Sequence, residues 1–307
     1  MNLSHLEAFC LAVKTGSITK TARQLHISQP ALSLQIQDLE NNLQTVLLAR
    51  NNKGVKPTAM GEIVFNYSSK ILKLAENMQR EIDRLKNDVL EELNVGASCT
   101  VGNFALPCSI YIFKEEFKAH DISLHISSVK DVIDKLISGS INIAVIEGPV
   151  SGYLQEIIKA EGLQSRKIAR DELVVVAPYE DWQDINEIKK SELPQQIFIL
   201  REKGCGIRET VEDTFLKHDI NMVDLNIRLE LNSTNAIISS VTAGKGMSIL
   251  PKMALRKELR HRTLKALKVE DITFSHNIYL LFSPESLKSE ISSRFIEFLS
   301  SPARGFC

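Results

Sequence analysis

The sequence predicts three consecutive regions: a helix-turn-helix followed by a short β-hairpin, one long helix, and a larger α/β region. Three observations predict them. The first 45 residues contain three short segments with apolar residues at helical spacing. Residues 58–89 contain no proline and carry apolar residues at alternating steps of four and three. Residues 91–307 alternate strand-like and helix-like segments, which is typical of α/β proteins with mostly parallel sheets.

Serine residues mark where the three N-terminal helices are expected to begin. Ser4, followed by Glu7, forms a capping box before the first helix, and Ser17 and Ser28 cap the second and third. Pro30 is tolerated in the third helix because N–H groups of the first turn have no partner within the helix. The third helix then buries one apolar stripe, formed by Leu32, Ile36, Leu39 and Leu43.

Opposite that stripe lies a polar, uncharged row formed by Gln29, Ser33 and Gln37. Amide side chains offer a donor and an acceptor together, the pattern that adenine displays in the major groove. Taken alone, such a row is usually a solvated helix face. Two short capped helices joined by a tight turn, however, form the helix-turn-helix arrangement, in which the second helix enters the groove. We therefore expect this row to contact the bases of double-stranded DNA.

Two short strand-like runs, residues 46–49 and 55–58, flank a basic turn and predict a β-hairpin wing. Arg50, Lys53 and Lys56 would then contact DNA phosphates or enter the minor groove. A solvated basic turn is the alternative. Residues 1–60 hold six Lys or Arg against three Asp or Glu, whereas the whole chain has a net charge of −1. A polyanionic partner is therefore expected at the N-terminal end.

Residues 58–89 predict a helix that packs against a second copy of the chain. Their apolar seam has heptad-like spacing, and few helices of globular domains reach this length, so we expect a dimer. Packing of the seam against the chain's own body is the alternative. The seam consists of Met60, Val64, Tyr67, Ile71, Leu74, Met78, Ile82, Leu85 and Val89.

Composition and motif content exclude several classes of function. The chain is 44% hydrophobic and 24% charged, and no apolar run reaches the roughly 18 residues of a membrane span. The N-terminus lacks a basic lead-in, so we expect a cytoplasmic protein with no membrane partner. Five widely spaced cysteines without a C-x-x-C pair predict reduced thiols, and we expect neither a metal nor a cofactor. No catalytic or nucleotide-binding fingerprint occurs, so we do not expect an enzyme.

Several segments match the pattern of a known family in order and spacing. In the C-terminal half they run from Arg201 to Arg208 and from Val241 to Pro251. The more specific N-terminal matches are Leu6-Glu7-Ala8-Phe9, Gly16-Ser17-Ile18, Ala22-Arg23-Gln24-Leu25, Ser28-Gln29-Pro30-Ala31-Leu32-Ser33, Ile36, Leu39-Glu40, Arg50, Thr58 and Gly61. With these residues the sequence closely resembles the LysR-type transcriptional regulators over essentially its whole length.

The resemblance implies a winged helix-turn-helix DNA-binding domain at 1–58, a linker helix for dimerisation at 59–90 and an effector-binding domain at 91–307. The last would consist of two α/β subdomains resembling periplasmic binding proteins: subdomain I at about 91–160 and 267–307, and subdomain II at about 161–266. The implied partners are promoter DNA, RNA polymerase, a small-molecule effector that is often an anion, and further copies of the chain in a homodimer or homotetramer. DNA contacts are expected from Ser28, Gln29, Pro30, Ser33, Leu34, Gln37, Arg50, Lys53 and Lys56.

The resemblance also implies where the effector binds. Open α/β sheets bind ligands beyond the carboxyl ends of their strands, where helix N-termini supply N–H donors suited to anions. For each Ser or Thr the equally weighted alternative is a helix cap or a turn. The residues implied to line the cleft are Ser98, Cys99, Thr100, Ser127, Ser128, Arg201, Cys205, Gly246 and Ser248.

Some residues depart from the family pattern. Leu34 and Gln37 replace residues that are often polar or basic, so the operator sequence cannot be carried over, and Val129 stands where Thr is common. Cys99 and Cys205 occupy loops that are usually richer in Ser or Thr. The alternative function is therefore a cysteine-based redox sensor that uses these two thiols.

Overall fold

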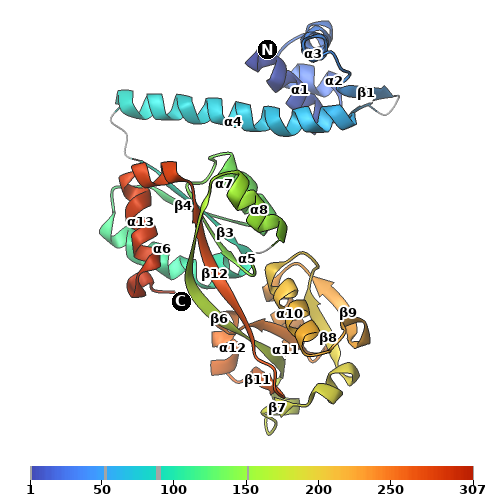
Figure 1. The fold of residues 1–307 in the computed structure, drawn as a ribbon, viewed down its shortest axis with the longest axis vertical. Helices are drawn as coiled ribbons and strands as arrows, with labels where there is room; N and C mark the ends of the chain where they lie inside the picture. Colours follow the sequence, from blue (N-terminus) through green and yellow to red (C-terminus); the bar gives the residue numbers. More distant parts are fainter. Residues whose placement is uncertain (1, 52–53, 88–90, 151, 307) are drawn as a thin grey trace. The chain divides into compact units, whose positions relative to one another are not determined.

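The structure is a computed structural model that describes residues 2–51, 54–87, 91–150 and 152–306 (Figure 1). The chain forms two compact units, one of residues 1–89 with 137–140 and the other of residues 90–136 with 141–307. The N-terminal unit is mainly helical and the C-terminal unit is an α/β structure. The predicted fold class is thereby confirmed.

In the N-terminal unit, three short helices precede a hairpin and a helix of 29 residues. Its turn between the second and third helices is tight, with His26 at a φ of 55°. The elements are α1 (Leu3–Thr15), α2 (Ile18–Gln24), α3 (Gln29–Leu43), β1 (Leu48–Asn51), β2 (Gly54–Pro57) and α4 (Ala59–Asn87).

Two of the three predicted serine caps are confirmed. The hydroxyls of Ser17 and Ser28 each accept a hydrogen bond from the N–H three residues later, at 3.4 and 3.3 Å. The prediction for Ser4 is wrong, because Asn2 caps α1 and its side chain accepts a hydrogen bond from the Ser4 N–H at 3.1 Å. Asn is as good an N-cap as Ser, so the helix begins earlier than the serine suggested.

The predicted apolar stripe of α3 packs into the core of the N-terminal unit. Leu32, Ile36 and Leu39 are fully buried there, whereas Leu43, in the last turn of α3, is 39% exposed. The Glu40 carboxylate accepts hydrogen bonds from the N–H groups of Leu47 at 2.7 Å and Leu48 at 3.2 Å. These bonds tie the start of the hairpin to α3.

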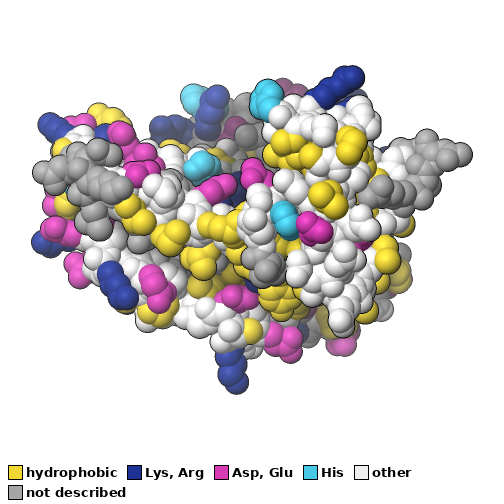
Figure 2. All heavy atoms as spheres, turned by 90° about the horizontal axis from the view of Figure 1, so that it is seen from above, with side chains coloured by type: hydrophobic (Ala, Val, Ile, Leu, Met, Phe, Trp, Pro, Cys, Tyr) yellow, Lys and Arg dark blue, Asp and Glu magenta, His cyan; other side chains and the backbone are white. Residues whose placement is uncertain are grey.

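Helix α4 leaves a stripe of apolar side chains exposed in the single chain. The stripe differs from the predicted seam at Val64, which is half-buried and packs against the core of its own unit. The side chain of Leu85 and all of Val89 lie outside the described residues. Hydrophobic side chains reach the surface at several places on the face drawn in Figure 2. The exposed apolar side chains of α4 are Met60, Ile63, Tyr67, Ile71, Leu74, Met78 and Ile82.

The C-terminal unit is built on a sheet in the order β4-β3-β5-β12-β6-β11-β7, with β10 also paired to β6, and on a separate pair β8-β9. The strands are β3 (Leu93–Ser98), β4 (Ile122–Ser127), β5 (Ile143–Glu147), β6 (Gln164–Pro178), β7 (Glu187–Ile188), β8 (Ile197–Arg201), β9 (Asn226–Leu231), β10 (Ser248–Pro251), β11 (Leu264–Val269) and β12 (Phe274–Phe282). The helices are α5 (Cys99–Phe104), α6 (Leu106–Glu116), α7 (Val129–Ile137), α8 (Gly152–Ala160), α9 (Tyr179–Trp182), α10 (Gly206–Lys217), α11 (Thr234–Thr242), α12 (Arg256–Arg260) and α13 (Glu290–Ser300).

The expectation of mostly parallel sheets needs correction. Parallel pairing joins β3 to β4 and β5, and β8 to β9, but β12 and β6 run antiparallel to each other through the middle of the large sheet. Strand β6 has 15 residues: its first half is largely exposed and polar, whereas residues 173–177 form a buried apolar run. Both long strands pass from one half of the unit to the other (Figure 1).

Two lobes result, each with its own core. The first lobe contains β3, β4, β5, helices α5 to α8 and α13, and the second contains β7 to β11 and helices α9 to α12 (Figure 1). On β12, Ile278 and Leu280 belong to the core of the first lobe, whereas Phe274 belongs to a core of the second. His276 lies between them, is 4% exposed, and both its ring nitrogens have no hydrogen-bond partner among the described residues.

The expectation that the cysteines are reduced thiols is met only in part. Cys10, Cys99 and Cys205 are free, but Cys108 is disulfide-bonded. Among the described residues, no helix combines the length and apolarity that a membrane crossing requires, and no group of His, Cys, Asp and Glu is placed to hold a metal ion.

Candidate nucleic-acid interface and ligand site

The polar face of α3 is open to solvent. Gln29 and Gln37 are exposed and Ser33 is half-buried, on a face of the helix about a quarter turn from the buried stripe of Leu32, Ile36 and Leu39. The Ser28 hydroxyl caps α3 by accepting a hydrogen bond from the Ala31 N–H. Pro30 and Leu34 are also exposed on this helix, and Leu34 is 59% exposed. The five predicted contact residues on α3 are therefore accessible to a large partner.

The hairpin forms as predicted, with Ala49 paired to Lys56 and Arg50 to Val55. Lys56 is exposed on β2. The side chain of Arg50 and all of Lys53 lie outside the described residues. Of the three cations predicted to contact DNA from the hairpin, Lys56 is therefore the one whose side chain is described.

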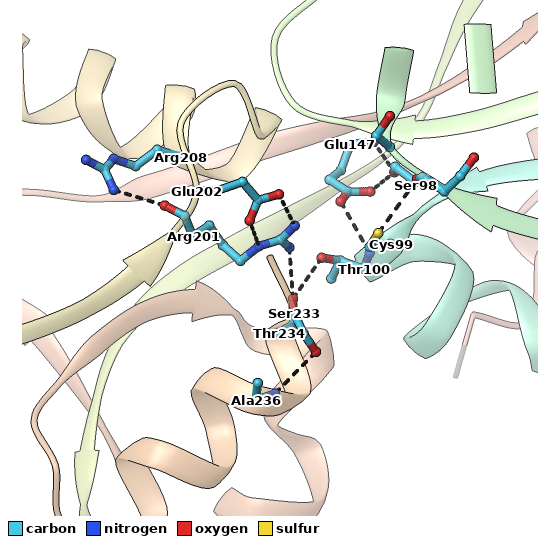
Figure 3. Close-up of polar contacts among 12 residues, drawn as sticks. Ser98, Cys99, Thr100, Glu147, Arg201, Glu202, Arg208, Ser233, Thr234 and Ala236 are labelled. Carbon is cyan, nitrogen blue, oxygen red and sulfur yellow. Dashed lines mark hydrogen bonds and ion pairs between the residues drawn. The ribbon is translucent and has the colours of Figure 1, made fainter. Parts of the chain in front are cut away.

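In the C-terminal unit, a buried carboxylate organises the carboxyl ends of β3 and β5. Glu147, the last residue of β5, is 4% exposed. Its carboxylate accepts hydrogen bonds from the hydroxyl of Ser98 and from the N–H groups of Thr100 at 3.3 Å and Val101 at 3.4 Å (Figure 3). In return the Ser98 hydroxyl accepts the Glu147 N–H at 3.1 Å. These donors stabilise the negative charge, and no cation of the described residues forms an ion pair with it.

A buried guanidinium occupies the matching position in the second lobe. Arg201 ends β8, and its side chain is 3% exposed. Its Nε and Nη2 donate to the Glu202 carboxylate at 3.2 and 3.0 Å, and its Nη1 donates to the Thr234 hydroxyl at 3.0 Å. Burial lowers the pKa of Arg201, but the Glu202 carboxylate and the nearby Cys205 and Cys99 together more than offset this, so the pKa ends above its ordinary value. Arg208 donates to the Arg201 carbonyl at 2.9 Å and fixes the end of the strand.

The two lobes touch at this place. The hydroxyls of Thr100 and Thr234 lie 3.5 Å apart, so a line of contacts runs from Glu147 through both threonines to Arg201 (Figure 3). The backbones meet as well, since a Cβ added to Gly206 would lie 2.5 Å from the Glu147 carbonyl oxygen. Only glycine permits this approach of α10 to β5.

Both thiols of the site are protonated at neutral pH. Burial raises the pKa of Cys205 to about 11; the nearby Arg201 charge lowers it and the Glu147 charge raises it. Burial likewise raises the pKa of Cys99, with the same two charges acting in opposite directions. Because the thiolate is the reactive species, the raised pKa values work against a redox-sensing role.

The site therefore brings together Ser98, Cys99, Thr100, Arg201 and Cys205 from the predicted set. The other predicted residues are placed as follows. Ser127 accepts a contact from the Cys99 thiol on its carbonyl, and Ser248 is fully buried; both hydroxyls have no hydrogen-bond partner among the described residues. Ser128 caps the first turn of α7 through Asp131, and Gly246 has a φ of 143° where its backbone packs against Ile197.

Sequence reasoning missed Glu147, Glu202 and Thr234. A signal was available for all three, because Glu147 ends β5, Glu202 directly follows β8 and Thr234 lies three residues beyond β9. The rule that ligands bind beyond the carboxyl ends of strands, which selected Ser98, applies to each of them. The ion pair of Glu202 with Arg201 is known only from the structure.

Two family models match the chain. Residues 3–62 match the bacterial regulatory helix-turn-helix protein of the lysR family, and residues 86–303 match the LysR substrate binding domain. A probable RuBisCO transcriptional regulator of Gracilaria tenuistipitata var. liui is 31% identical over 294 residues, which cover 95% of this chain and 94% of the relative. A relative of the same description from Chlorokybus atmophyticus is 32% identical over 91% of this chain and 88% of its own length.

Solved structures with the same fold include CbnR, a LysR family transcriptional regulator, in a full-length complex with its target DNA. It is 21% identical, with a TM-score of 0.72 and coverage of 97% of this chain and 99% of its own. The regulatory domain of CcmR from Synechocystis PCC6803, in complex with 2-PG, is 22% identical, with a TM-score of 0.58 over 68% of this chain and 95% of its own.

The two units and their matches define a DNA-binding transcription regulator with an effector-binding domain, not an enzyme. The chain belongs to the LysR-type transcriptional regulator family.

Proposed function

We propose that this regulator binds promoter DNA through α3 and its hairpin, and that a small anion bound between the two lobes modulates that binding. We propose that the two lobes are the subdomains I and II expected from the sequence. The observation that carries the proposal is the buried Arg201 guanidinium, which lies beside the carboxyl ends of strands from both lobes. A buried, fixed guanidinium is a natural partner for a carboxylate or phosphate group.

The mechanism needs two states that the ligand can bias. Thr100 and Thr234 belong to different lobes and touch across the junction, and β6 and β12 connect the lobes. A ligand held by both lobes favours their closure in proportion to its differential affinity for the closed state. We propose that closure changes the placement of paired DNA-binding units in a homodimer or homotetramer, and with it the contact to RNA polymerase. Because its target is promoter DNA, we propose that the protein acts in the cytoplasm.

DNA recognition is tested by fluorescence anisotropy with the chain's own upstream intergenic DNA and a scrambled duplex of equal length. RuBisCO promoter DNA is a third probe, because curated relatives carry that name. Gln37→Ala should lower the preference for the specific duplex about tenfold, the effect of one lost base contact of about 1.4 kcal/mol. Lys56→Ala should weaken all duplexes alike and reduce the salt slope by about one phosphate contact. Equal affinity of the wild-type chain for all three duplexes at moderate salt would contradict the proposal.

Effector binding is tested by thermal shift with small carboxylates and phosphates, including 2-PG. A ligand that binds only the folded chain raises its melting temperature by mass action. The same ligand should change affinity for the specific duplex, and Arg201→Lys should weaken its binding because lysine cannot donate in the same forked geometry. An anion that raises the melting temperature equally in wild type and Arg201→Lys binds elsewhere and does not support the proposed site.

A further inference from the structure

Two buried charges of opposite sign face the junction of the lobes without neutralising each other. Glu147 is 4% exposed in the first lobe and Arg201 is 4% exposed in the second. Glu147 receives its hydrogen bonds from a hydroxyl and two backbone N–H groups, and Arg201 pairs with Glu202. Among the hydrogen bonds and ion pairs of the described residues, none joins Glu147 to Arg201. Each charge is therefore stabilised by residues of its own lobe.

A short line of contacts through two threonines joins the two charges. Thr100 donates its N–H to Glu147 at 3.3 Å and its hydroxyl lies 3.5 Å from that of Thr234, which Arg201 contacts at 3.0 Å (Figure 3). Both charges also act on the same sulfur atom of Cys205, in opposite directions. A line of two threonine side chains is therefore all that separates the anion from the cation.

Both charged groups retain hydrogen-bonding capacity. The contacts of Arg201 use three of the five N–H groups that a guanidinium carries. The Glu147 carboxylate has no cationic partner among the described residues, and an opposite charge nearby would favour its ionised form. Ser127, the register partner of Ser98 on the neighbouring strand, has a buried hydroxyl without a hydrogen-bond partner among the described residues. A ligand with both donors and acceptors would satisfy all three groups.

The charges around the site restrict the class of ligand that can bind there. Glu147 and Glu202 place two negative charges beside the one positive charge of Arg201. A ligand that carries only negative charge would be attracted by Arg201 and repelled by Glu147. A ligand that adds an ammonium group to its carboxylate meets a complementary charge at each end.

We propose that the junction selects a small zwitterion of the α-amino acid class, with its carboxylate on Arg201 and its ammonium group directed at Glu147. The inference rests on the proposed function, since it takes the junction as the effector site, and it replaces a simple anion by a carboxylate that also carries an ammonium group. Glu147 is then the residue that sets specificity, because it penalises ligands that lack the ammonium group.

The test uses the full chain and three probes of one carbon skeleton. A thermal-shift panel of the α-amino acids selects the tightest binder, and calorimetry then compares it with its 2-hydroxy acid and its α-amide. The hydroxy acid lacks the ammonium group, and the amide lacks the carboxylate. The amino acid should bind at least tenfold more tightly than either. Glu147→Gln keeps oxygen and size but removes the charge, so it should erase most of the preference over the hydroxy acid.

The outcomes separate this inference from the proposed function. If the hydroxy acid binds wild type as tightly as the amino acid, the inference is wrong. This comparison uses only the wild-type chain, so it does not depend on the folding of a variant. If carboxylates or 2-PG bind and change DNA affinity while no amino acid does, the proposed function stands and the zwitterion is excluded. If Glu147→Gln folds, as judged by circular dichroism, and keeps the full preference for the amino acid, Glu147 does not set specificity. If no probe of any class binds, both proposals fail.

Discussion

The thiol of Cys205 shows how burial can outweigh a neighbouring charge. Arg201 lies near the sulfur and lowers its pKa, yet burial raises the pKa to about 11. At pH 8 only about one thiol in a thousand is then ionised. We predict that iodoacetamide labels Cys205 of the folded chain slowly at neutral pH, with a rate that keeps rising with pH up to about 11. Mass spectrometry of the labelled peptide measures the rate.

The urea-unfolded chain is the matched control for this labelling. Unfolding restores an ordinary cysteine pKa of about 8.5, so the rate should level off at lower pH. Rapid labelling of the folded chain with a plateau below about pH 7 would contradict the prediction and revive the redox-sensing alternative.

At the scale of elements, β12 carries a buried imidazole between the cores of the two lobes. Burial lowers the pKa of His276 to about 4, below its ordinary value of 6.5. The unfolded chain therefore binds a proton at higher pH than the folded chain does. The contribution of His276 to stability is complete above pH 6.5 and is lost as pH falls from 6.5 towards 4.

We predict that wild type loses about 2 kcal/mol more stability than His276→Leu between about pH 7.5 and pH 5. Urea unfolding at the two pH values measures the difference, and titration of other groups cancels because both proteins share them. Leucine is a suitable replacement because the buried imidazole has no hydrogen-bond partner among the described residues, so an apolar side chain can fill its place. Equal losses in the two proteins would show that His276 is protonated as readily in the folded state as in the unfolded chain.

Local signals predicted some elements well and others poorly. Ser17 and Ser28 mark their helices correctly because a cap acts on N–H groups of the same turn. Only the apolar end of the long strand β6 has a strand-like sequence, because its other half pairs with β12 while its side chains stay largely exposed. Glu147 was missed because its three donors come from a segment 46 to 49 residues earlier in the chain. Such a site exists only once the strands are assembled.

At the scale of the whole molecule, the apolar stripe of α4 is the feature that a single chain leaves unexplained. The exposed positions recur at steps of three and four, and Leu74 and Tyr67 are 69% and 66% exposed. Seven such residues on one side of a 29-residue helix form the pattern that packs against another helix. We propose that α4 pairs with the α4 of a second copy, which doubles the DNA-binding units and increases their combined affinity.

We predict that Leu74→Glu raises the dimer dissociation constant at least about 100-fold. Each copy loses one leucine of about 1.5 kcal/mol or more from the interface, and two like charges are brought together. Sedimentation equilibrium measures the constant. Asn66→Glu is the control, because Asn66 is exposed on the same helix but lies roughly 100° around it from the stripe. Unchanged folding of both variants with loss of the dimer in Leu74→Glu alone supports the prediction. A dimer that survives Leu74→Glu would place the interface elsewhere and leave the stripe of α4 to pack against the chain's own body.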